Sequence, residues 1–402
     1  MYIGGLFYFK TTRLILWLYI ETIIEMGSPM KPRICFVIPE YNANTPTHFN
    51  YINDLIKGAS KNFDIFLVAE KGNGRQDFID EKYFYIQKFR FAPLRFLENL
   101  ALFIKLRLMG YDNFYIHYSF LSAFNSSIIA GISGARTFYW NCGLPWLYKR
   151  NYFRNLFERI TYKLVTFLVT GTESLKKEYS KHYLLPLSKI KILPNWIDLN
   201  NFSARGGSSY GEKIVSAVSE KIRKEIDPSG RNKILLFVHR LSKRKGADYL
   251  PEIMLGLKNE NVILAVIGDG PEREALESKV KSQKLKVKFF GWIPNEKIKD
   301  YFGAADVFIM PSEEEGFPHV ILESMAAGVP FIAFSVGGVR EISPPEFSKY
   351  IVTFGDKSGF INKIREILHY NQMEIERLSD IEKSWVKRFD LPAVVEKFKN
   401  LF

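Results

Sequence analysis

The sequence predicts an α/β protein built from two doubly wound, Rossmann-like domains that face each other across a cleft. Its 402 residues exceed what one hydrophobic core usually supports, which favours two domains. Short β-branched or aromatic runs alternate with helical stretches, the pattern of parallel sheets covered by helices on both faces. This alternation occurs in two series, separated by a segment rich in glycine, serine and charged residues.

The first series contains seven candidate strands, several of them apolar throughout, as expected of strands that are buried on both faces. They are Ile34–Ile38, Ile65–Ala69, Phe84–Gln87, Phe114–Tyr118, Thr137–Trp140, Leu168–Thr170 and Ile190–Leu193. The second series contains six, which are Ile234–Val238, Val262–Ile267, Val287–Phe290, Val307–Met310, Phe331–Phe334 and Ile351–Phe354. Ligands of doubly wound sheets bind beyond the carboxyl ends of the strands, so the cleft between the domains is the expected site.

The domain boundaries follow from this alternation. We assign residues 30–200 to the first domain, 201–232 to the interdomain connection and 233–375 to the second domain. A C-terminal helix over 376–402 is expected to cross back to the first domain. The composition, 47% hydrophobic and 25% charged, is that of a globular protein. The two cysteines do not make a disulfide framework, which fits a cytoplasmic protein.

Residues 1–29 form an N-terminal extension. Its apolar stretch, Leu14–Ile24, is interrupted by a glutamate and falls short of the ~20 residues that span a bilayer. The extension also lacks the small-residue cleavage site of a signal peptide. It is therefore an interfacial helix, a peripheral anchor or a mis-assigned start. The fold-like pattern begins only at Met30, so we take Met26 or Met30 as the true start.

The formal net charge of +13 is concentrated in one part of the chain. The stretch from Lys82 to Leu185 has 15 basic and 5 acidic residues, interleaved with aromatic side chains. Such a pattern suits an anionic membrane surface, and a solvated face over a core is the alternative. We expect no nucleic-acid partner, because no nucleic-acid-binding motif accompanies the charge.

The segment from Pro311 to Glu341 is the most informative in the sequence. It follows a buried strand, and Gly316 can supply a sharp turn. A helix is expected from His319 to about Ala327, with Pro318 at its first helical position and glycine at its end. The free backbone amides at the start of this helix, together with its dipole, favour a phosphate or another anion.

Charged side chains accompany this helix. Glu315 precedes it and Glu323 lies within it, a spacing that suits two parts of one extended ligand. A carboxylate accepts paired hydrogen bonds, which the vicinal hydroxyls of a sugar or ribose offer. Arg240 and Lys245 follow the predicted strand Ile234–Val238, where two cations could neutralise a diphosphate. Spacing alone does not exclude that the two glutamates belong to an exposed acidic segment and that Arg240 and Lys245 belong to a basic surface loop, with no ligand at either.

These segments together resemble the donor-binding domain of the retaining family 4 glycosyltransferases, also described as glycosyl transferases group 1, which have the GT-B fold. The family's Glu, seven residues, Glu pattern matches Glu315 and Glu323 within EGFPHVILESMAAGVP. Its Arg-Leu and Lys-Gly pairs match Arg240 with Leu241 and Lys245 with Gly246. The segments PNWID, GDGPERE, GWIP, AADVFIMPS and GGVRE follow the family's order, so the resemblance covers about 200 residues.

The resemblance implies a role for each residue. Glu323 would bind the ribose hydroxyls of the nucleotide and Glu315 the hydroxyls of the transferred sugar. Arg240 and Lys245 would hold the diphosphate. The backbone near Trp292 and Ile293 would meet the base. The loop and helix start that would assist the donor through its backbone comprise Gly316, Phe317, Pro318, His319 and Val320.

In the first domain the resemblance is weaker. His117 ends the strand Phe114–Tyr118, at a position where the family often has a sugar-contacting histidine, although a lone histidine is more often structural. The family usually has a Gly-Gly pair after the first strand, but the loop over residues 40–49 lacks glycine. His239 stands where the family usually has glycine before Arg240, which adds bulk near the expected diphosphate.

The function that the resemblance implies is transfer of a hexose-type sugar from a nucleoside-diphosphate sugar, with retention of configuration. The sequence has no Asp-x-Asp motif that would bridge a metal to the diphosphate, so neither a metal nor another cofactor is expected. The first domain would bind the acceptor, a saccharide or a lipid-linked saccharide in glycan or polysaccharide biosynthesis. The protein would then be cytoplasmic and peripheral at the inner face of the cell membrane.

Other classes of protein share the two-domain plan. A nucleotide-sugar epimerase and a phosphorylase are enzymes of related fold, and a non-catalytic nucleotide-sugar-binding or scaffold protein is the alternative from a different class. The combination of two glutamates with Arg240 and Lys245 argues against the epimerase. An NAD-dependent dehydrogenase is disfavoured, because GNGRQ at Gly72 is an incomplete glycine fingerprint in the wrong place.

Overall fold

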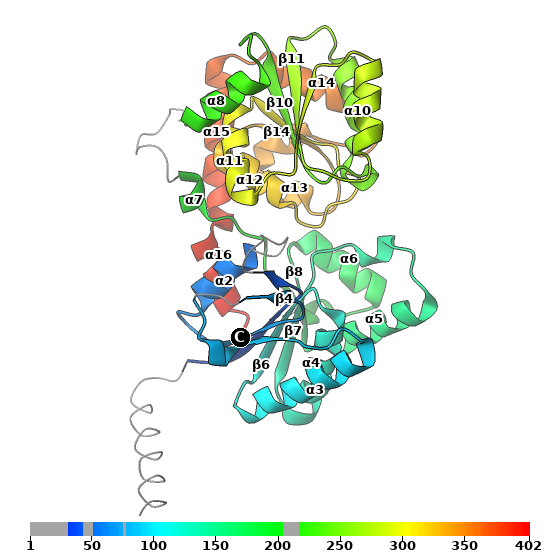
Figure 1. The fold of residues 1–402 in the computed structure, drawn as a ribbon, viewed down its shortest axis with the longest axis vertical. Coiled ribbons are helices and arrows are strands. Elements are labelled where there is room, and N and C mark those ends of the chain that lie inside the picture. The colour runs from blue at the N-terminus through cyan, green and yellow to red at the C-terminus, as the bar shows by residue number, and fades with distance from the viewer. Residues whose placement is uncertain (1–30, 43–50, 75–77, 204–216) are drawn as a thin grey trace, which may run out of the picture.

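The computed structural model describes residues 31–42, 51–74, 78–203 and 217–402. Over these ranges the chain forms two α/β domains, each with a parallel sheet, that lie one above the other in Figure 1. The predictions for the N-terminal extension and for most of the loop 40–49 concern residues outside these ranges. The same holds for residues 204–216 of the expected interdomain connection.

The first domain contains a seven-stranded parallel sheet in the order β5-β3-β1-β6-β7-β8-β9. Its strands are β1 (Arg33–Ile38), β3 (Asp64–Ala69), β5 (Phe84–Ile86), β6 (Asn113–His117), β7 (Arg136–Trp140), β8 (Phe167–Thr170) and β9 (Ile190–Ile192). All seven predicted strands are confirmed. Strand β6 stops one residue earlier than expected, because Tyr118 adopts a left-handed conformation with φ of 58° that ends the extended backbone.

The second domain contains a six-stranded parallel sheet in the order β12-β11-β10-β13-β14-β15. Its strands are β10 (Lys233–Val238), β11 (Val262–Ile267), β12 (Val287–Gly291), β13 (Val307–Met310), β14 (Phe331–Phe334) and β15 (Ile351–Val352), which confirms all six predictions. In each sheet the chain first adds strands on one side of its first strand, β1 or β10, and then crosses over to add the remaining strands on the other side. The order therefore reverses between β1 and β6 and between β10 and β13, the two switch points at which such sheets bind ligands.

Helices cover both faces of each sheet. Those of the first domain are α2 (Tyr51–Ala59), α3 (Ala92–Leu108), α4 (Phe120–Ser133), α5 (Tyr152–Leu164) and α6 (Glu173–Tyr183). Helix α7 (Leu199–Ser203) follows, and the second domain has α8 (Ala217–Ile226), α9 (Leu250–Gly256), α10 (Arg273–Ser282), α11 (Asn295–Ala304), α12 (His319–Ala327), α13 (Val339–Ile342) and α14 (Lys357–Leu368). Helix α8, from the predicted connection, packs against α11 of the second domain.

The C-terminal segment forms two helices where the sequence predicted one. Helix α15 (Gln372–Val386) packs on α12 of the second domain, whereas α16 (Leu391–Lys399) packs on α2 of the first domain (Figure 1). The expected crossing back to the first domain is thus confirmed. The helix is interrupted because Pro392 cannot lie in a helix interior, and Asp390 caps the new helix at the backbone amide of Leu391.

A short two-stranded parallel ribbon was not predicted. It joins β2 (Tyr41–Asn42) to β4 (Gly72–Asn73) at the carboxyl ends of β1 and β3. Gly72 has φ of 137°, and a Cβ atom there would lie 1.6 Å from the carbonyl oxygen of Tyr41. The glycine of the GNGRQ segment therefore allows two backbones to approach each other, which accounts for it without a dinucleotide.

Candidate functional site

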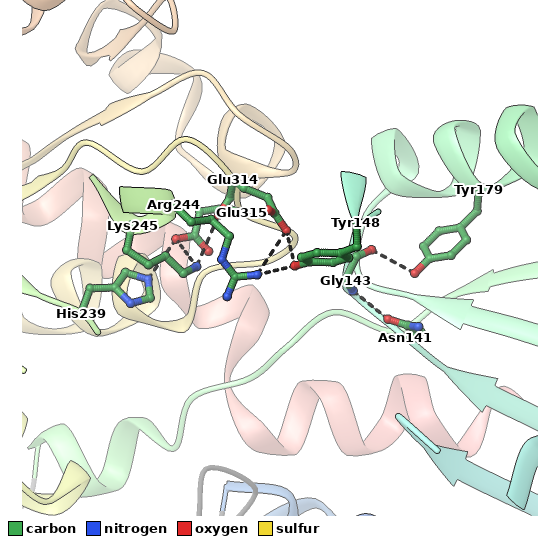
Figure 2. Close-up of polar contacts among 9 residues, drawn as sticks. All are labelled: Asn141, Gly143, Tyr148, Tyr179, His239, Arg244, Lys245, Glu314 and Glu315. Atoms are coloured by element: carbon green, nitrogen blue, oxygen red, sulfur yellow. Dashed lines mark hydrogen bonds and ion pairs between the residues drawn. The ribbon is translucent and has the colours of Figure 1, made fainter. Parts of the chain in front are cut away.

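The candidate site lies at the switch point of the second sheet. His239 and Arg240 directly follow β10, and the loop that contains Glu315 follows β13, the neighbouring strand. Because parallel strands end at the same edge of a sheet, residues about 75 positions apart in the chain meet there. Figure 2 shows His239 and Lys245 converging on Glu315.

Glu315 is a buried carboxylate with two hydrogen-bond donors. Its Oε1 atom lies 2.8 Å from Nζ of Lys245 and 3.0 Å from Nε2 of His239. Burial alone raises the pKa of Glu315, but the charge of Lys245 and the hydrogen bond from His239 outweigh it and lower the pKa to about 2. Glu315 is therefore ionised at neutral pH and stays an acceptor of hydrogen bonds.

His239 is a neutral donor to Glu315. The backbone amide of Arg240 donates to its Nδ1 atom at 3.0 Å, so Nδ1 carries a lone pair and Nε2 carries the proton. Burial lowers the pKa of His239, against the opposing effect of Glu315, which is consistent with the neutral ring. His239, which stands where the family usually has glycine, thus binds Glu315, the carboxylate that is predicted to contact the transferred sugar.

The two predicted diphosphate cations differ in their surroundings. Lys245 is mostly buried and bound to Glu315, and it also donates to the carbonyl oxygen of Glu314 at 3.3 Å. Arg240 is exposed and makes no ion pair with another described residue. The site therefore contains one cation fixed by a carboxylate and one that is accessible to an incoming anion.

Arg244 is exposed but also reaches the first domain. Its guanidinium contacts the hydroxyl of Tyr148 and lies 3.6 Å from Oε1 of Glu314. Tyr148 donates to the same Glu314 oxygen at 2.6 Å, as Figure 2 shows. Sequence reasoning missed this interdomain contact, since its members lie 96 and 166 residues apart.

Helix α12 has the predicted bounds. It runs from His319 to Ala327 and ends at Gly328, whose φ is 65°. Pro318, however, is the N-cap and not the first helical residue, with φ of −73° and ψ of 113°. His319 and Val320 are consequently the first two helical residues, and their amides have no partner within the helix. Such a helix start can bind an anion.

The loop before α12 packs closely against the first domain. A Cβ atom at Gly316 would lie 1.6 Å from the carbonyl oxygen of Cys142, so no other residue fits there without movement. Phe317 is buried with its ring against Phe389, and its carbonyl oxygen accepts from Nδ2 of Asn195 at 2.9 Å. These predicted donor-loop residues therefore also join the two domains.

The GGVRE segment also contacts both the loop that contains Glu315 and the first domain. A Cβ atom at Gly337 would lie 1.6 Å from the carbonyl oxygen of Glu315. Glu341 accepts from the backbone amides of Glu173 and Ser174 at 2.6 and 2.9 Å, at the start of α6 in the first domain. The GGVRE segment thus packs against the loop that contains Glu315, and its Glu341 caps the start of α6 in the other domain.

Glu323 lies on α12, one turn after His319 and on the same face of the helix. It is half-buried, and no hydrogen bond or ion pair joins its carboxylate to another described residue. Burial raises the pKa of Glu323 to about 7. Glu315 and Glu323 therefore differ in charge: near neutral pH the first is ionised and the second is about half protonated.

Trp292 and Ile293 directly follow β12, which lies two strands from β10 in the sheet. Trp292 is 59% exposed, while Ile293 is partly buried. Their position at the same sheet edge as Arg240 is that expected for a surface contacting the far end of an extended ligand. The large exposed ring is available for such a contact.

His117 lies at the switch point of the first sheet and is fully buried. Its ring stacks on Trp140 with centroids 4.1 Å apart, and its Nε2 atom is 3.1 Å from the hydroxyl of Tyr51. The ring of Tyr51 lies 4.5 Å from that of His319 at the start of α12. Tyr51, which sequence reasoning did not single out, thus connects His117 to the second domain.

A second group that sequence reasoning missed surrounds Glu70, directly after β3. Its carboxylate is buried and accepts from the hydroxyls of Ser119 and Ser122. Gln87, after the neighbouring β5, is 2% exposed, and its side-chain amide has no hydrogen-bond partner. Glu70 directly follows a predicted strand and Gln87 is the last residue of one, so the rule that located Arg240 at the carboxyl end of its strand could have found them.

Within the described ranges, no three His, Cys, Asp or Glu side chains come together in an arrangement that could hold a metal ion. None of the helices in the described part of the chain is long and apolar enough to cross a membrane.

Comparisons with known sequences concern mainly the second domain. Residues 218–384 match the family described as "Glycosyl transferases group 1". The chain is 35% identical over 178 residues to an uncharacterized glycosyltransferase of Methanocaldococcus jannaschii, a match that covers 44% of each chain. It is 25% identical over 228 residues to the UDP-Gal:alpha-D-GlcNAc-diphosphoundecaprenol alpha-1,3-galactosyltransferase of Escherichia coli, covering 55% of each. The chain spans about half the length of these relatives.

Comparisons with solved structures cover nearly the whole chain. Sucrose-phosphate synthase from Thermosynechococcus elongatus superposes with a TM-score of 0.73 at 19% identity, over 92% of this chain and 98% of that one. HepE of Anabaena in complex with UDP-glucose gives a TM-score of 0.71 at 17% identity, over 92% and 98%. The predicted GT-B fold is thereby confirmed. The family match and the relatives support a group 1 glycosyltransferase, while family 4 and retention remain predictions.

Proposed function

We propose that this protein is a retaining, metal-independent glycosyltransferase that transfers a hexose-type sugar from a nucleoside-diphosphate sugar. The observation that carries the proposal is the Glu315–Lys245–His239 group at the switch point of the second sheet, next to the exposed Arg240 and the start of α12. It lies in the part of the chain that matches the group 1 family.

The charges suit a diphosphate leaving group. Negative charge grows on the diphosphate as the glycosidic bond breaks, and fixed cations stabilise it without reorganising. Arg240 is accessible, and Lys245 is held in position by Glu315, so both can serve as such cations. A charge-assisted hydrogen bond contributes roughly 1.5–3 kcal/mol, of which only the part gained in the transition state speeds the reaction.

The two glutamates suit the two sugar rings of the donor. Ionised Glu315 is an acceptor for hydroxyls of the transferred sugar, close to Lys245. Glu323 lies on the next part of the same segment and, when ionised, would accept from the ribose hydroxyls. The half-protonated state of free Glu323 implies that donor binding shifts its equilibrium towards the carboxylate.

Two relatives indicate the substrates. HepE binds UDP-glucose and the E. coli relative uses UDP-galactose with a diphosphoundecaprenol acceptor, as their names state. We therefore propose a UDP-sugar donor and a saccharide or lipid-linked saccharide acceptor in glycan or polysaccharide biosynthesis. With such an acceptor the enzyme would work in the cytoplasm, peripherally at the inner face of the cell membrane.

Calorimetric titration with UDP-, GDP-, dTDP- and ADP-sugars in EDTA tests the donor site. We expect one donor to bind to wild type and to lose its affinity in Glu323→Ala, while Glu274→Ala, an exposed glutamate on α10, binds normally. Loss of binding in EDTA that is restored by a divalent cation would disprove metal independence.

Turnover distinguishes the enzyme from its alternatives. With the donor identified, NMR of the product formed on a diphospholipid-linked saccharide should show the anomeric configuration of the donor. Donor binding without transfer to any saccharide acceptor would favour a binding or scaffold protein. Interconversion of two nucleotide sugars without transfer would favour an epimerase.

A further inference from the structure

Helix α3 is apolar on the face that it exposes. Its inner face contributes Leu102, Phe103 and Leu106 to the core. Its outer face presents exposed leucines and an isoleucine at helical spacing, namely Leu94, Leu97, Ile104 and Leu108, preceded by the exposed Phe91 at the N-cap. Leu108 is 84% exposed. A surface helix normally has a polar outer face, but no residue in the described ranges covers this apolar stripe.

Helix α5 has a similar outer stripe. Its exposed apolar side chains are Tyr152, Phe153, Leu156, Ile160 and Leu164. Tyr152 and Phe153, at its N-terminus, are 73% and 79% exposed. The side chains on its inner face, Glu158, Thr161 and Tyr162, are buried.

The two stripes belong to one side of the first domain. Helix α4 packs between α3 and α5, and the rings of Phe96, Phe124 and Phe157 link the three helices with centroids 6.5 and 5.0 Å apart. In Figure 1 the three helices lie together, away from α2 and α16. We call this the α3–α5 surface, made of the outer faces of α3 and α5 with their preceding turns. Exposed large apolar residues are concentrated in this domain: eighteen of the twenty-three in the described chain lie between Tyr83 and Leu187, and ten of those eighteen belong to the two stripes.

The charges around these stripes are almost entirely positive. Residues 88–109 and 147–164 contain ten Lys and Arg and only two acidic residues, Glu98 and Glu158. Both carboxylates are bound internally: Glu98 by the hydroxyl of Tyr85 and nearby amides, and Glu158 by Arg150 and Tyr183. The exposed cations without an ion-pair partner among the described residues are Lys88, Arg90, Lys105, Lys149, Arg154, Arg159 and Lys163.

The second domain shows the opposite arrangement. There Arg273 pairs with Asp269 and Glu277, and Arg365 pairs with Glu260. Several surface cations of the second domain are thus paired within the chain, whereas the exposed cations of the α3–α5 surface have no such partner among the described residues and can meet an external anion.

We propose that the α3–α5 surface docks on an anionic lipid bilayer, with both apolar stripes in the acyl boundary and the cations at the headgroups. Apolar stripes bordered by Lys and Arg are the composition of interfacial helices. A second copy of the chain is disfavoured as the occupant, because its own unpaired cations would face those of the first copy. The inference rests on the proposed function for its purpose, since docking would bring a lipid-linked acceptor to the first domain.

Flotation with lipid vesicles tests the surface independently of sugar transfer. Full-length wild type should float with vesicles of phosphatidylcholine mixed with phosphatidylglycerol, and float much less with phosphatidylcholine alone. In Lys105→Glu/Lys163→Glu the partition coefficient on anionic vesicles should fall at least roughly 25-fold, since each cation near the surface contributes about fivefold. In Leu97→Ser/Phe153→Ser it should fall roughly tenfold or more on the same vesicles.

Matched variants of the second domain serve as controls. Lys279→Glu/Lys281→Glu reverses two exposed cations on α10, and Met373→Ser removes a side chain that is 74% exposed on α15. Both should float like wild type. All variants should keep the wild-type melting temperature and calorimetric donor affinity, which excludes unfolding as the cause.

Three results would overturn the proposal. They are no flotation of wild type on anionic vesicles, equal losses in the control variants, or a dimer in light scattering that the α3 and α5 substitutions dissociate without affecting flotation. Flotation by a protein that binds no nucleotide sugar would refute the proposed function and leave the docking surface intact.

Discussion

At the switch point of the second sheet the side chains are charged and paired, whereas at that of the first sheet they are aromatic. Between β10 and β13, Glu315 binds Lys245 and His239. Between β1 and β6, His117 stacks on Trp140 and meets the hydroxyl of Tyr51. The two edges meet where the rings of Tyr51 and His319 lie 4.5 Å apart.

This difference indicates that the two sheet edges have different roles. A charged group such as Lys245, held in position by Glu315, can also attract a ligand phosphate, so the second edge can bind an anion. Stacked and buried rings lose packing contacts if they move. The aromatic edge of the first sheet is therefore expected to keep its conformation and to support the loop before α12. Changes at the charged edge should therefore affect chemistry, and changes at the aromatic edge should affect stability.

The largest effect is expected for Lys245→Ala. It removes a proposed diphosphate-binding cation and leaves Glu315 buried with only His239, so kcat should fall about 10²–10³-fold. Breaking a buried ion pair should also cost about 3 kcal/mol of stability at pH 7. The pKa of Glu315 is about 2, below its ordinary value of 4.5, so its contribution is full above pH 4.5 and is lost as the pH falls towards 2.

Steady-state kinetics and urea unfolding between pH 3 and 8 would measure both effects of this substitution. The control is Lys243→Ala, an exposed lysine of the same loop that should retain wild-type values. If Lys243→Ala impaired turnover as strongly, general basicity of the loop and not the pair with Glu315 would be responsible.

Glu323→Gln should separate binding from stability. The pKa of Glu323 is raised from 4.5 to about 7, so the stability that its protonated form provides is full below pH 4.5 and is lost as the pH rises through 7. The glutamine variant should therefore match wild type at pH 4.5 and exceed it at pH 8, by on the order of 1–2 kcal/mol after allowance for partial exposure.

The same variant should bind the donor at least tenfold more weakly at pH 8, because the proposed charged acceptor for the ribose hydroxyls is lost. Unfolding curves at both pH values and donor calorimetry would measure this, with Glu274→Gln on α10 as the control. A variant that is no more stable at pH 8 would show that Glu323 is better solvated than its burial implies.

At the aromatic edge, Tyr51→Phe should affect stability more than donor binding. It removes the hydrogen bond between the hydroxyl of Tyr51 and His117, 3.1 Å long, but keeps the ring contacts with Trp196 and His319. We expect a loss of about 1 kcal/mol in the free energy of unfolding. Donor affinity, measured by calorimetry, should change by less than about threefold. A loss of donor affinity as large as that in Glu323→Gln would contradict the prediction that the aromatic edge affects stability more than donor binding.

The sequence was sufficient for features that depend on local patterns. The strands were predictable from apolar runs, and α12 from the proline and Gly328 that bound it. The break at Asp390 had a signal too, because Pro392 follows it, but a continuous helix was expected there. Contacts of long range were not predictable. His239 was interpreted as added bulk, since nothing in its own segment indicates that Glu315, 76 residues away, accepts its hydrogen bond.

The smallest effect is expected where the two domains touch through exposed groups. Burial and the neighbouring Glu314 raise the pKa of Tyr148, so its hydroxyl keeps the proton that it donates to Glu314. Exposed contacts of this kind contribute roughly 0–1 kcal/mol, so Tyr148→Phe should unfold within about 0.5 kcal/mol of wild type. Its donor affinity, measured by calorimetry, should change less than about twofold, as should that of Arg244→Ala, which removes the other partner. A tenfold loss in both variants would mean that the first domain positions the Glu314–Glu315 loop, and the charged edge would then depend on the aromatic domain for its geometry.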